Sequence, residues 1–248
     1  MPYSTAELEK LTLTADYHTH TVFSHGTGTI EENVIEAMAK NLKSIAITDH
    51  GFRHWMIAIS PADIPKMRAE VERLRKLYPI EILLGIEANL ISLNGDLDLS
   101  EEQAKLFDIL IFGAHFTAKP KTLKACFSWW LGNVFCRTKA QREKNTQAYI
   151  KAIRRYKPKI VVHLNHMVRV NCAELARVAA ECGTLIELNA KRTIFSEEEV
   201  KDMLATNVNF VISSDAHSAD RVGEFSHVKK FLANHYIPLN RIVNIKQE

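Results

Sequence analysis

Nine residues of the types that bind transition metals recur at the ends of short apolar runs in the sequence. Each run is rich in aliphatic and β-branched residues, which is typical of a buried strand. Imidazole nitrogens and carboxylate oxygens are the ligands that Zn²⁺, Mn²⁺ and Fe²⁺ take in proteins. Histidines scattered at random would not coincide with strand ends so often, so the pattern predicts a site for several metal ions in a hydrolase. The nine residues are His18, His20, His25, His50, Glu87, His115, His163, Asp215 and His217.

The spacing of these residues indicates how they could share metal ions. His18 and His20 are separated by one residue, as are Asp215 and His217, and alternate residues of an extended chain point to the same side. Glu87 stands alone, but its two carboxylate oxygens can bridge two metals. Two cations about 3.5–4 Å apart activate a bridging water, and a third can bind a phosphate oxygen. The pattern therefore favours phosphoester hydrolysis, because its transition state spreads negative charge over several oxygens.

Four further residues near the predicted strand ends are candidates for supporting roles. Arg53, Arg169 and Arg192 all follow a predicted strand end, and a guanidinium group binds phosphate well. Of the three, Arg192 is the preferred phosphate contact, because it comes just after Asn189 at the end of a strand. Asp49 precedes His50 and is expected to orient an imidazole.

Strand and helix patterns alternate almost from one end of the chain to the other. The intervening helices are marked by the capping residues Ser60, Ser100, Asn171 and Ser196, and one of them closes at Gly183. This alternation predicts parallel βαβ units, whose functional sites lie at the carboxyl ends of the strands. The seven predicted strands cover residues 13–17, 44–48, 80–86, 107–113, 159–162, 184–188 and 209–213.

One segment, residues 117–139, interrupts this alternation. It contains Trp129 and Trp130, two of the three tryptophans, within a largely apolar stretch. Connections longer than about 12–15 residues without regular structure are uncommon and often functional. Three interpretations stand side by side: a lid over the site, a contact between two copies of the chain, or a helix packed on the barrel.

Length and composition favour a single α/β domain over residues 1–248. The net charge of +3 is small and the basic residues are dispersed, so nucleic-acid binding is not indicated. No signal peptide and no apolar run of the roughly 18–20 residues that span a bilayer are visible. Cys172 and Cys182 bracket a predicted helix and lie too far apart for a disulfide. These features predict a cytoplasmic protein with reduced thiols.

Six sequence blocks resemble the PHP (polymerase and histidinol phosphatase) family, and most of all its small stand-alone trinuclear-metal phosphatases. Each block is short, but their order and spacing are specific, and together they extend from about residue 16 to residue 223. The blocks are Asp16-Tyr17-His18-Thr19-His20-Thr21, Ile47-Thr48-Asp49-His50-Gly51, Gly85-Ile86-Glu87, Ala114-His115, Val162-His163 and Ser213-Ser214-Asp215-Ala216-His217.

The resemblance implies a distorted (β/α)7 TIM-like barrel that binds three divalent metal ions, most often zinc and sometimes manganese or iron. One metal would be held by His18, His20, Glu87 and Asp215. Glu87 would bridge to a second metal, which is also bound by His115 and His163. His25, His50 and His217 would hold the third. The family usually has His-Pro-Gly where this chain has His163-Leu164-Asn165, so the loop beside the second metal differs.

The expected activity is hydrolysis of a small phosphorylated metabolite, such as histidinol phosphate, by attack of a metal-bridging hydroxide. Asp215, Glu87 and His217 are the expected catalytic residues. A phosphodiesterase or 3′–5′ exonuclease is the alternative enzyme, although the sequence has no basic strip to bind a nucleic acid. A catalytically silent metal-binding scaffold, with the 117–139 insertion recruiting a partner, is the alternative outside enzymes.

Overall fold

Seven parallel strands form the centre of the computed structural model, which describes residues 2–135 and 138–247. Neighbouring strands in the sheet are also consecutive in the sequence, as βαβ units require. The strands are β2 (Ala15–Thr19), β3 (Ser44–Ile47), β4 (Glu81–Asn89), β5 (Ile109–Gly113), β6 (Ile160–Val161), β7 (Leu185–Asn189) and β8 (Phe210–Ser213).

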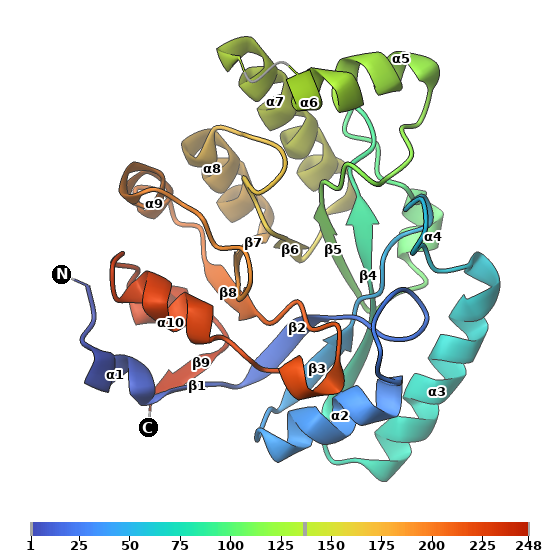
Figure 1. The fold of residues 1–248 in the computed structure, drawn as a ribbon, viewed down its shortest axis with the longest axis vertical. Coiled ribbons are helices and arrows are strands. Elements are labelled where there is room, and N and C mark those ends of the chain that lie inside the picture. The colour runs from blue at the N-terminus through green and yellow to red at the C-terminus, as the bar shows by residue number, and fades with distance from the viewer. Residues whose placement is uncertain (1, 136–137, 248) are drawn as a thin grey trace.

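The sheet curves until its last strand approaches its first. The backbone N–H of His20 donates to the carbonyl of Ala216 at 2.8 Å, and the N–H of Ala216 donates to the carbonyl of His18 at 3.3 Å. These two bonds join the end of β2 to the segment after β8 and complete a nearly closed barrel (Figure 1). The predicted distorted (β/α)7 barrel is thus confirmed.

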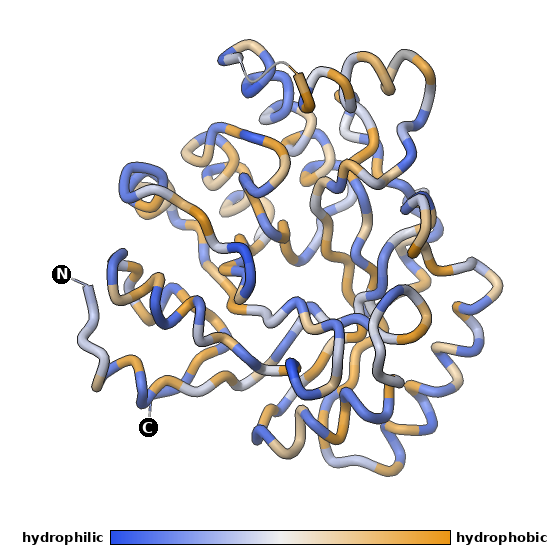
Figure 2. Tube along the Cα trace, viewed as in Figure 1, coloured by the Kyte–Doolittle hydropathy of each residue, from blue (hydrophilic) through white to orange (hydrophobic). Residues whose placement is uncertain are grey.

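Helices form the outer layer of the barrel in Figure 1. The predicted cap residues are found where expected: Asn171 and Ser196 accept hydrogen bonds from the first turns of α8 and α9. Figure 2 shows apolar colouring alternating with polar colouring along the helices, as expected for helices with one buried face. The α-helices are α1 (Thr5–Glu9), α2 (Ile30–Ala39), α3 (Ile64–Leu77), α4 (Glu101–Ala104), α5 (Leu123–Ala125), α6 (Gly132–Phe135), α7 (Lys139–Tyr156), α8 (Cys172–Cys182), α9 (Glu197–Leu204) and α10 (Ser226–Leu232).

The inward side of the strands changes from apolar to polar along the barrel. On β7, Leu185 belongs to the small buried cluster formed by the strands, and Glu187 and Asn189 follow on the same side. On β4 the sequence Leu83, Gly85, Glu87 repeats this order. The carboxyl ends of the strands therefore carry buried polar groups above an apolar base.

In two of the predicted strands, the difference between the predicted and observed bounds changes where candidate ligands lie. The first, predicted over residues 13–17, is split at Thr14: β1 (Leu11–Leu13) pairs with the C-terminal β9 (Ile245–Gln247), and β2 begins at Ala15. The strand predicted over residues 80–86 extends to Asn89, because β4 continues to pair with β5 up to Gly113. As a result, His18 and Glu87 lie within strands and not just beyond them. The antiparallel β1–β9 pair, which joins the two ends of the chain, was not predicted.

Of the 117–139 insertion, residues 123–135 are helical, and Lys139 begins α7. A π-helix, Cys126–Leu131, connects α5 to α6. The ring of Trp129 is 4% exposed, and the indole N–H of Trp130 donates to the Phe116 carbonyl at 2.6 Å. These contacts agree with the interpretation of a helix packed on the barrel. Leu123, Phe127 and Phe135 lie on the exposed side.

Two predictions about the chain as a whole can be compared with the structure. Among the described cysteines, Cys126, Cys172 and Cys182 are free thiols, while Cys136 lies outside the described residues. Within residues 2–135 and 138–247, no helix combines the length and apolar character needed to cross a membrane.

Candidate metal centre

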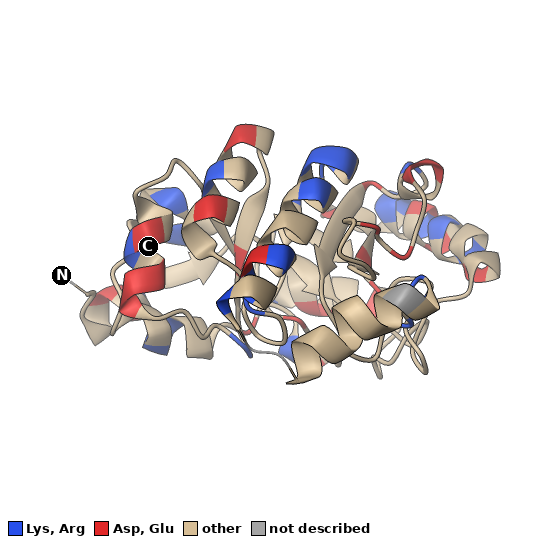
Figure 3. Cartoon of the chain, turned by 90° about the horizontal axis from the view of Figure 1, so that it is seen from above, with Lys and Arg blue, Asp and Glu red and all other residues tan. Residues whose placement is uncertain are grey.

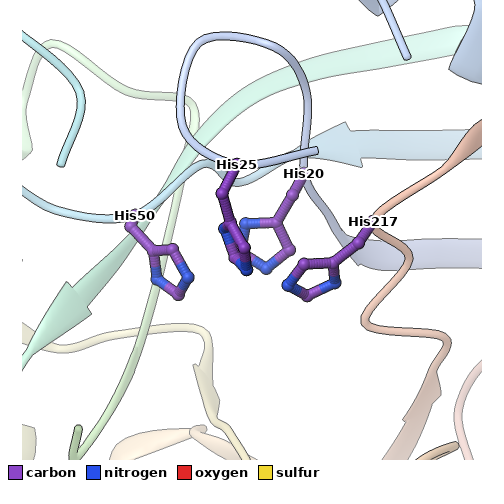
Figure 4. A group of neighbouring side chains, drawn as sticks. All are labelled: His20, His25, His50 and His217. Atoms are coloured by element: carbon purple, nitrogen blue, oxygen red, sulfur yellow. The ribbon is translucent and has the colours of Figure 1, made fainter. Parts of the chain in front are cut away.

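Four histidines converge at the carboxyl ends of the strands. Candidate ligand atoms of His20, His25, His50 and His217 all lie within 4.8 Å of one another. Figure 4 shows their rings gathered together, with His20 and His25 on the loop after β2, His50 after β3 and His217 after β8. His25 was the least certain candidate from sequence, and the structure brings its ring to 4.1 Å from the His217 ring, centroid to centroid.

The turn that carries His25 is held by Asp49. The Asp49 carboxylate accepts hydrogen bonds from the Thr21 backbone N–H at 2.8 Å, the Thr21 hydroxyl at 2.6 Å and the Ser24 hydroxyl at 2.5 Å. None of these three hydrogen bonds comes from an imidazole, so the carboxylate does not hold a histidine ring by direct contact. Its donors come from the main chain and hydroxyls of the turn, so it positions His25 through the backbone.

Glu87 lies at the centre of the remaining ligands. Its Oε1 is 2.7 Å from Nε2 of His163 and 3.5 Å from Nε2 of both His18 and His115. Its Oε2 is 2.7 Å from Nδ1 of His50, although the geometry is not that of a hydrogen bond. Such crowding of acceptor atoms is expected where several groups face the same cations, and it suits a bridging carboxylate.

Two other groups of candidate ligands share members with the four-histidine cluster. One consists of His18, His20 and Asp215, and the other of His50, Glu87 and His115. His20 and His50 thus each belong to two groups. The sequence analysis had assigned His20 to one metal and His50 to another, whereas the structure brings each within reach of two.

Several buried ligand atoms have no hydrogen-bond partner among the described residues. They include Nε2 of His18, both ring nitrogens of His20 and Oε2 of Glu87. A buried polar atom without a partner is costly, so such atoms normally have one. Divalent cations would satisfy Nε2 of His18, one ring nitrogen of His20 and Oε2 of Glu87, and the donor set of imidazoles and carboxylates suits Zn²⁺, Mn²⁺ or Fe²⁺. The residues present therefore fit the predicted metal ions.

The electrostatics prepare the same groups for metal binding. Burial alone would raise the pKa of Glu87, but the imidazoles of His115, His50 and His18 lower it well below its ordinary value. Burial lowers the pKa of His20 and of His115 well below 6.5. Carboxylates that stay ionised and imidazoles that stay neutral are the protonation states in which these groups bind metals.

Two further buried residues fix the orientation of ligand rings. Glu187 Oε1 is 2.7 Å from Nδ1 of His18, and the Asn89 side-chain oxygen is 2.7 Å from Nδ1 of His115. In both cases Nδ1 donates, which leaves Nε2 free to bind a metal. Sequence analysis missed both roles. The available signal was the alternation along the strand, which puts Glu187 on the same side as Asn189.

Two ligands adopt backbone conformations that residues other than glycine rarely take. His163 has φ = 33° and Asp215 has φ = 53°. Nearby bonds hold both: the His163 N–H donates to Glu187 at 2.7 Å, and the Asn189 amide donates to Asp215 at 3.2 Å. A side chain at Gly113 would overlap the His163 ring, so this position requires glycine. Local strain of this kind is characteristic of functional sites.

The three predicted phosphate-binding arginines lie in different surroundings. Arg192 lines the cavity of about 220 Å³ that the ligands form, and its guanidinium contacts Nε2 of His166 at 2.8 Å. Arg53 donates to the carbonyls of Lys119 and Pro120 and so ties two loops together. Arg169 lines a neighbouring cavity. The structure therefore brings only Arg192 of the three into the metal cavity.

Two residues beside the centre were not predicted. His54 lines the same cavity and stacks on His50, with the ring centroids 4.8 Å apart. The Lys191 ammonium lies 2.7 Å from Nδ1 of His217 and 3.6 Å from Asp215. Lys191 lies between Asn189 and Arg192, and His54 follows Arg53, so the strand ends that pointed to the two arginines were also the available signal for these two residues.

The metal-free protein is expected to lose stability in acid. Burial and neighbouring imidazoles lower the pKa of His25 to about 3 and that of His54 to about 4, against 6.5 ordinarily. Between pH 6.5 and about 4 the unfolded chain therefore binds more protons at these two sites, so their contribution to the free energy of unfolding falls as pH falls. His18, whose pKa is raised by Glu187, Glu87 and Asp215, acts in the opposite direction.

Urea unfolding at pH 7.5 and 5.5 in the presence of chelator checks this expectation. The wild type should lose more stability on acidification than a His25→Gln, His54→Gln double variant, because only the wild type carries the two imidazoles. An equal loss in both proteins would contradict the assignment.

A parallel α/β barrel with imidazoles and carboxylates gathered at the carboxyl ends of its strands defines a class, the metal-dependent hydrolases. Within this class the chain belongs to the PHP domain family, whose pattern it matches over residues 16–217. The predicted family is thus confirmed.

Relatives and solved structures agree with this membership. A protein of Acetivibrio thermocellus named "Probable phosphatase" is 30% identical over 94% of this chain and 91% of its own length. A protein of Yersinia pestis with the same name is 31% identical over 93% of this chain and 89% of its own length. Histidinol phosphate phosphatase of Lactococcus lactis, which was crystallised with zinc, L-histidinol and phosphate, shares the fold with a TM-score of 0.62. The two sequences are 18% identical, and the similarity covers 89% of this chain and 92% of that one. The predicted class of metal-dependent phosphoesterase is confirmed at the level of the family.

Proposed function

We propose that this protein is a phosphomonoesterase that hydrolyses a small phosphorylated metabolite with the help of three divalent metal ions, zinc before manganese or iron. The observation that carries the proposal is the convergence of three overlapping ligand groups on the buried carboxylate of Glu87. The phosphatase names of its relatives and the zinc in the Lactococcus lactis enzyme support it.

The nine predicted ligands divide into three sets in this proposal. His18, His20 and Asp215, together with Glu87, would hold one cation. His115 and His163, again with Glu87, would hold a second, and His25, His50 and His217 would hold the third. Bound in these positions, the cations would supply an activated water and stabilise negative charge on the phosphoryl oxygens.

The protein itself supplies orientation, charge and exclusion of water. Glu187 and Asn89 hold two imidazoles with Nε2 toward the centre. Arg192 and Lys191 line or border the cavity and carry positive charge toward an incoming phosphate. Asp215, Glu87 and His217, the proposed catalytic residues, lie at the base of this cavity.

Paired assays on enzyme loaded with a defined metal test the proposal. p-Nitrophenyl phosphate should be hydrolysed, and bis-p-nitrophenyl phosphate should be a much poorer substrate. A chelator should abolish the activity until the metal is restored. Turnover of the diester alone would favour the phosphodiesterase. A fully metal-loaded protein inactive on both esters would favour the scaffold.

Substitution of Arg192 should weaken phosphate binding. We expect Arg192→Gln to raise KM for p-nitrophenyl phosphate by about tenfold, since one charge-assisted contact of this kind contributes roughly 1.5–3 kcal/mol. Arg53→Gln is the matched comparison, because the Arg53 guanidinium binds main-chain carbonyls. It should lower thermal stability and affect KM less. Steady-state kinetics and melting curves of both variants measure the difference, and a larger KM effect in Arg53→Gln would reverse the assignment.

A dispersed charge pattern supports a small substrate over a nucleic acid. Figure 3 shows Lys and Arg distributed over the helices, with no continuous basic strip on the face in view. A cytoplasmic location and a contact between two copies through the exposed Leu123, Phe127 and Phe135 belong to the same proposal. Light scattering of the wild type and a Phe127→Ser variant tests the contact.

A further inference from the structure

A second cavity of about 380 Å³ lies beside the metal centre. Its walls come from α6 of the insertion, the first turn of α7 and the loop after β6. Met167 lines both this cavity and the metal cavity. His166 lines the second cavity and contacts Arg192, which lines the first. The two spaces therefore adjoin along the Met167 and His166 side chains.

The second cavity is lined by basic side chains. Lys139, Arg142 and Arg169 line the cavity together with a single carboxylate, Glu199. Glu199 is already engaged, because it accepts hydrogen bonds from the Asn165 amide at 2.7 Å and the Ser196 N–H at 3.0 Å. Among the described residues, Lys139 and Arg169 have no side-chain hydrogen-bond or ion-pair partner. Two positive charges are thus left to interact with whatever enters the cavity.

The backbone adds to this positive character. Thr138 caps α7, an 18-residue helix, and the residues of its first turn line the cavity. A helix N-terminus carries a partial positive charge and favours anions. The effect reinforces the cationic side chains.

A buried amide network makes the cavity wall rigid. The Gln141 amide donates to Asn145 at 3.0 Å, and the Asn145 amide donates to Asn133 at 2.7 Å. Asn133 belongs to the insertion, so this network fastens the insertion to α7. Hydrogen bonds between buried side chains of this kind restrict the shape of the cavity wall before a ligand arrives.

We propose that the second cavity binds an anionic group at the far end of the substrate, so that the preferred substrates are phosphate monoesters with a second phosphate or a carboxylate. The inference rests on the proposed phosphomonoesterase function and specifies its substrate class. Histidinol phosphate carries an ammonium group in place of this anion, so the basic cavity disfavours it. The insertion thereby acquires a function: it forms one wall of the subsite that selects the substrate.

Matched substrate pairs test the proposal on the full-length, metal-loaded protein. 3-Phosphoglycerate and glycerol 3-phosphate differ by a carboxylate, and fructose 1,6-bisphosphate and fructose 6-phosphate differ by a phosphate. In at least one pair, kcat/KM should be about tenfold or more higher for the member with two anions. Histidinol phosphate should be poorer than the preferred member.

A Lys139→Gln, Arg169→Gln double variant should bring the ratio within that pair close to one. Arg177→Gln, a substitution of an exposed arginine on α8, is the matched control and should leave the ratio unchanged. Provided that p-nitrophenyl phosphate is still hydrolysed, any of three results would overturn the proposal. These are equal kcat/KM within both pairs, a preference for histidinol phosphate, and an unchanged ratio in the double variant. If no monoester is hydrolysed, the proposed function fails and the subsite assignment fails with it.

Discussion

Glu87→Gln is expected to reduce kcat/KM by about three orders of magnitude or more, a loss of about 4 kcal/mol of transition-state stabilisation. The reason is the position of this carboxylate, which lies within 3.7 Å of a ring nitrogen of five histidines. A glutamine side chain is neutral and has one oxygen, so it cannot bridge two cations. Bound metal should fall along with activity, as measured by elemental analysis after gel filtration.

The matched control for this substitution lies on the same strand. Glu81 is the first residue of β4 and is exposed at the opposite end of the barrel. Glu81→Gln should keep both activity and metal content. A Glu87→Gln protein that retains more than a tenth of wild-type kcat/KM would show that the bridging role is wrongly assigned.

Glu187→Gln is expected to weaken metal binding by about 10–100-fold without unfolding the protein. Glu187 accepts three hydrogen bonds: Oε1 accepts from Nδ1 of His18, and Oε2 accepts from the His163 N–H and the Asn189 amide. A glutamine can accept at only one of these two positions, because its other terminal atom is an NH₂ group. If its oxygen stays on His163, the NH₂ group faces His18, which can accept this bond only with its proton on Nε2. That tautomer cannot bind a metal through Nε2.

Competition with a fluorescent chelator measures the effect directly and does not depend on turnover. Glu181→Gln, at an exposed carboxylate of α8, is the control. The melting temperature of the metal-free Glu187→Gln protein should stay near that of the metal-free wild type. Wild-type metal affinity in Glu187→Gln would show that Glu187 does not determine the tautomer of His18.

The sequence could predict the barrel because its signals are local. Short apolar runs, helix caps and the alternation of strand and helix each depend on a few neighbouring residues, and all seven parallel strands were found in this way. Strand ends were less predictable because pairing partners decide them. β4 continues past Ile86 since β5 offers hydrogen-bonding groups up to Gly113, which the β4 sequence alone does not reveal.

The candidate metal ligands could be predicted from the sequence, but the residues that orient them could not. Histidine is uncommon enough that its recurrence after strands is noticeable, whereas Glu187 and Asn89 look like ordinary polar residues of a strand. The way in which Asp49 acts was not predictable, because its position before His50 does not reveal that the fold turns the carboxylate toward Thr21 and Ser24. The second cavity depends on packing between α6 and α7, and no local sequence pattern predicts such a contact.

The closure of the barrel has a consequence for how the protein is made. The Asp16 carboxylate accepts a hydrogen bond from the Ser214 N–H, 198 residues away, and one from the Gly223 N–H, 207 residues away. His18 and Asp215 therefore come together only when nearly the whole chain has been synthesised. A cation bound by both side chains, as proposed, would close a loop of almost the full chain length, and restricting so long a loop would stabilise the folded state. Availability of metal during synthesis should thus influence how much of the protein reaches its folded form, as well as how active it is.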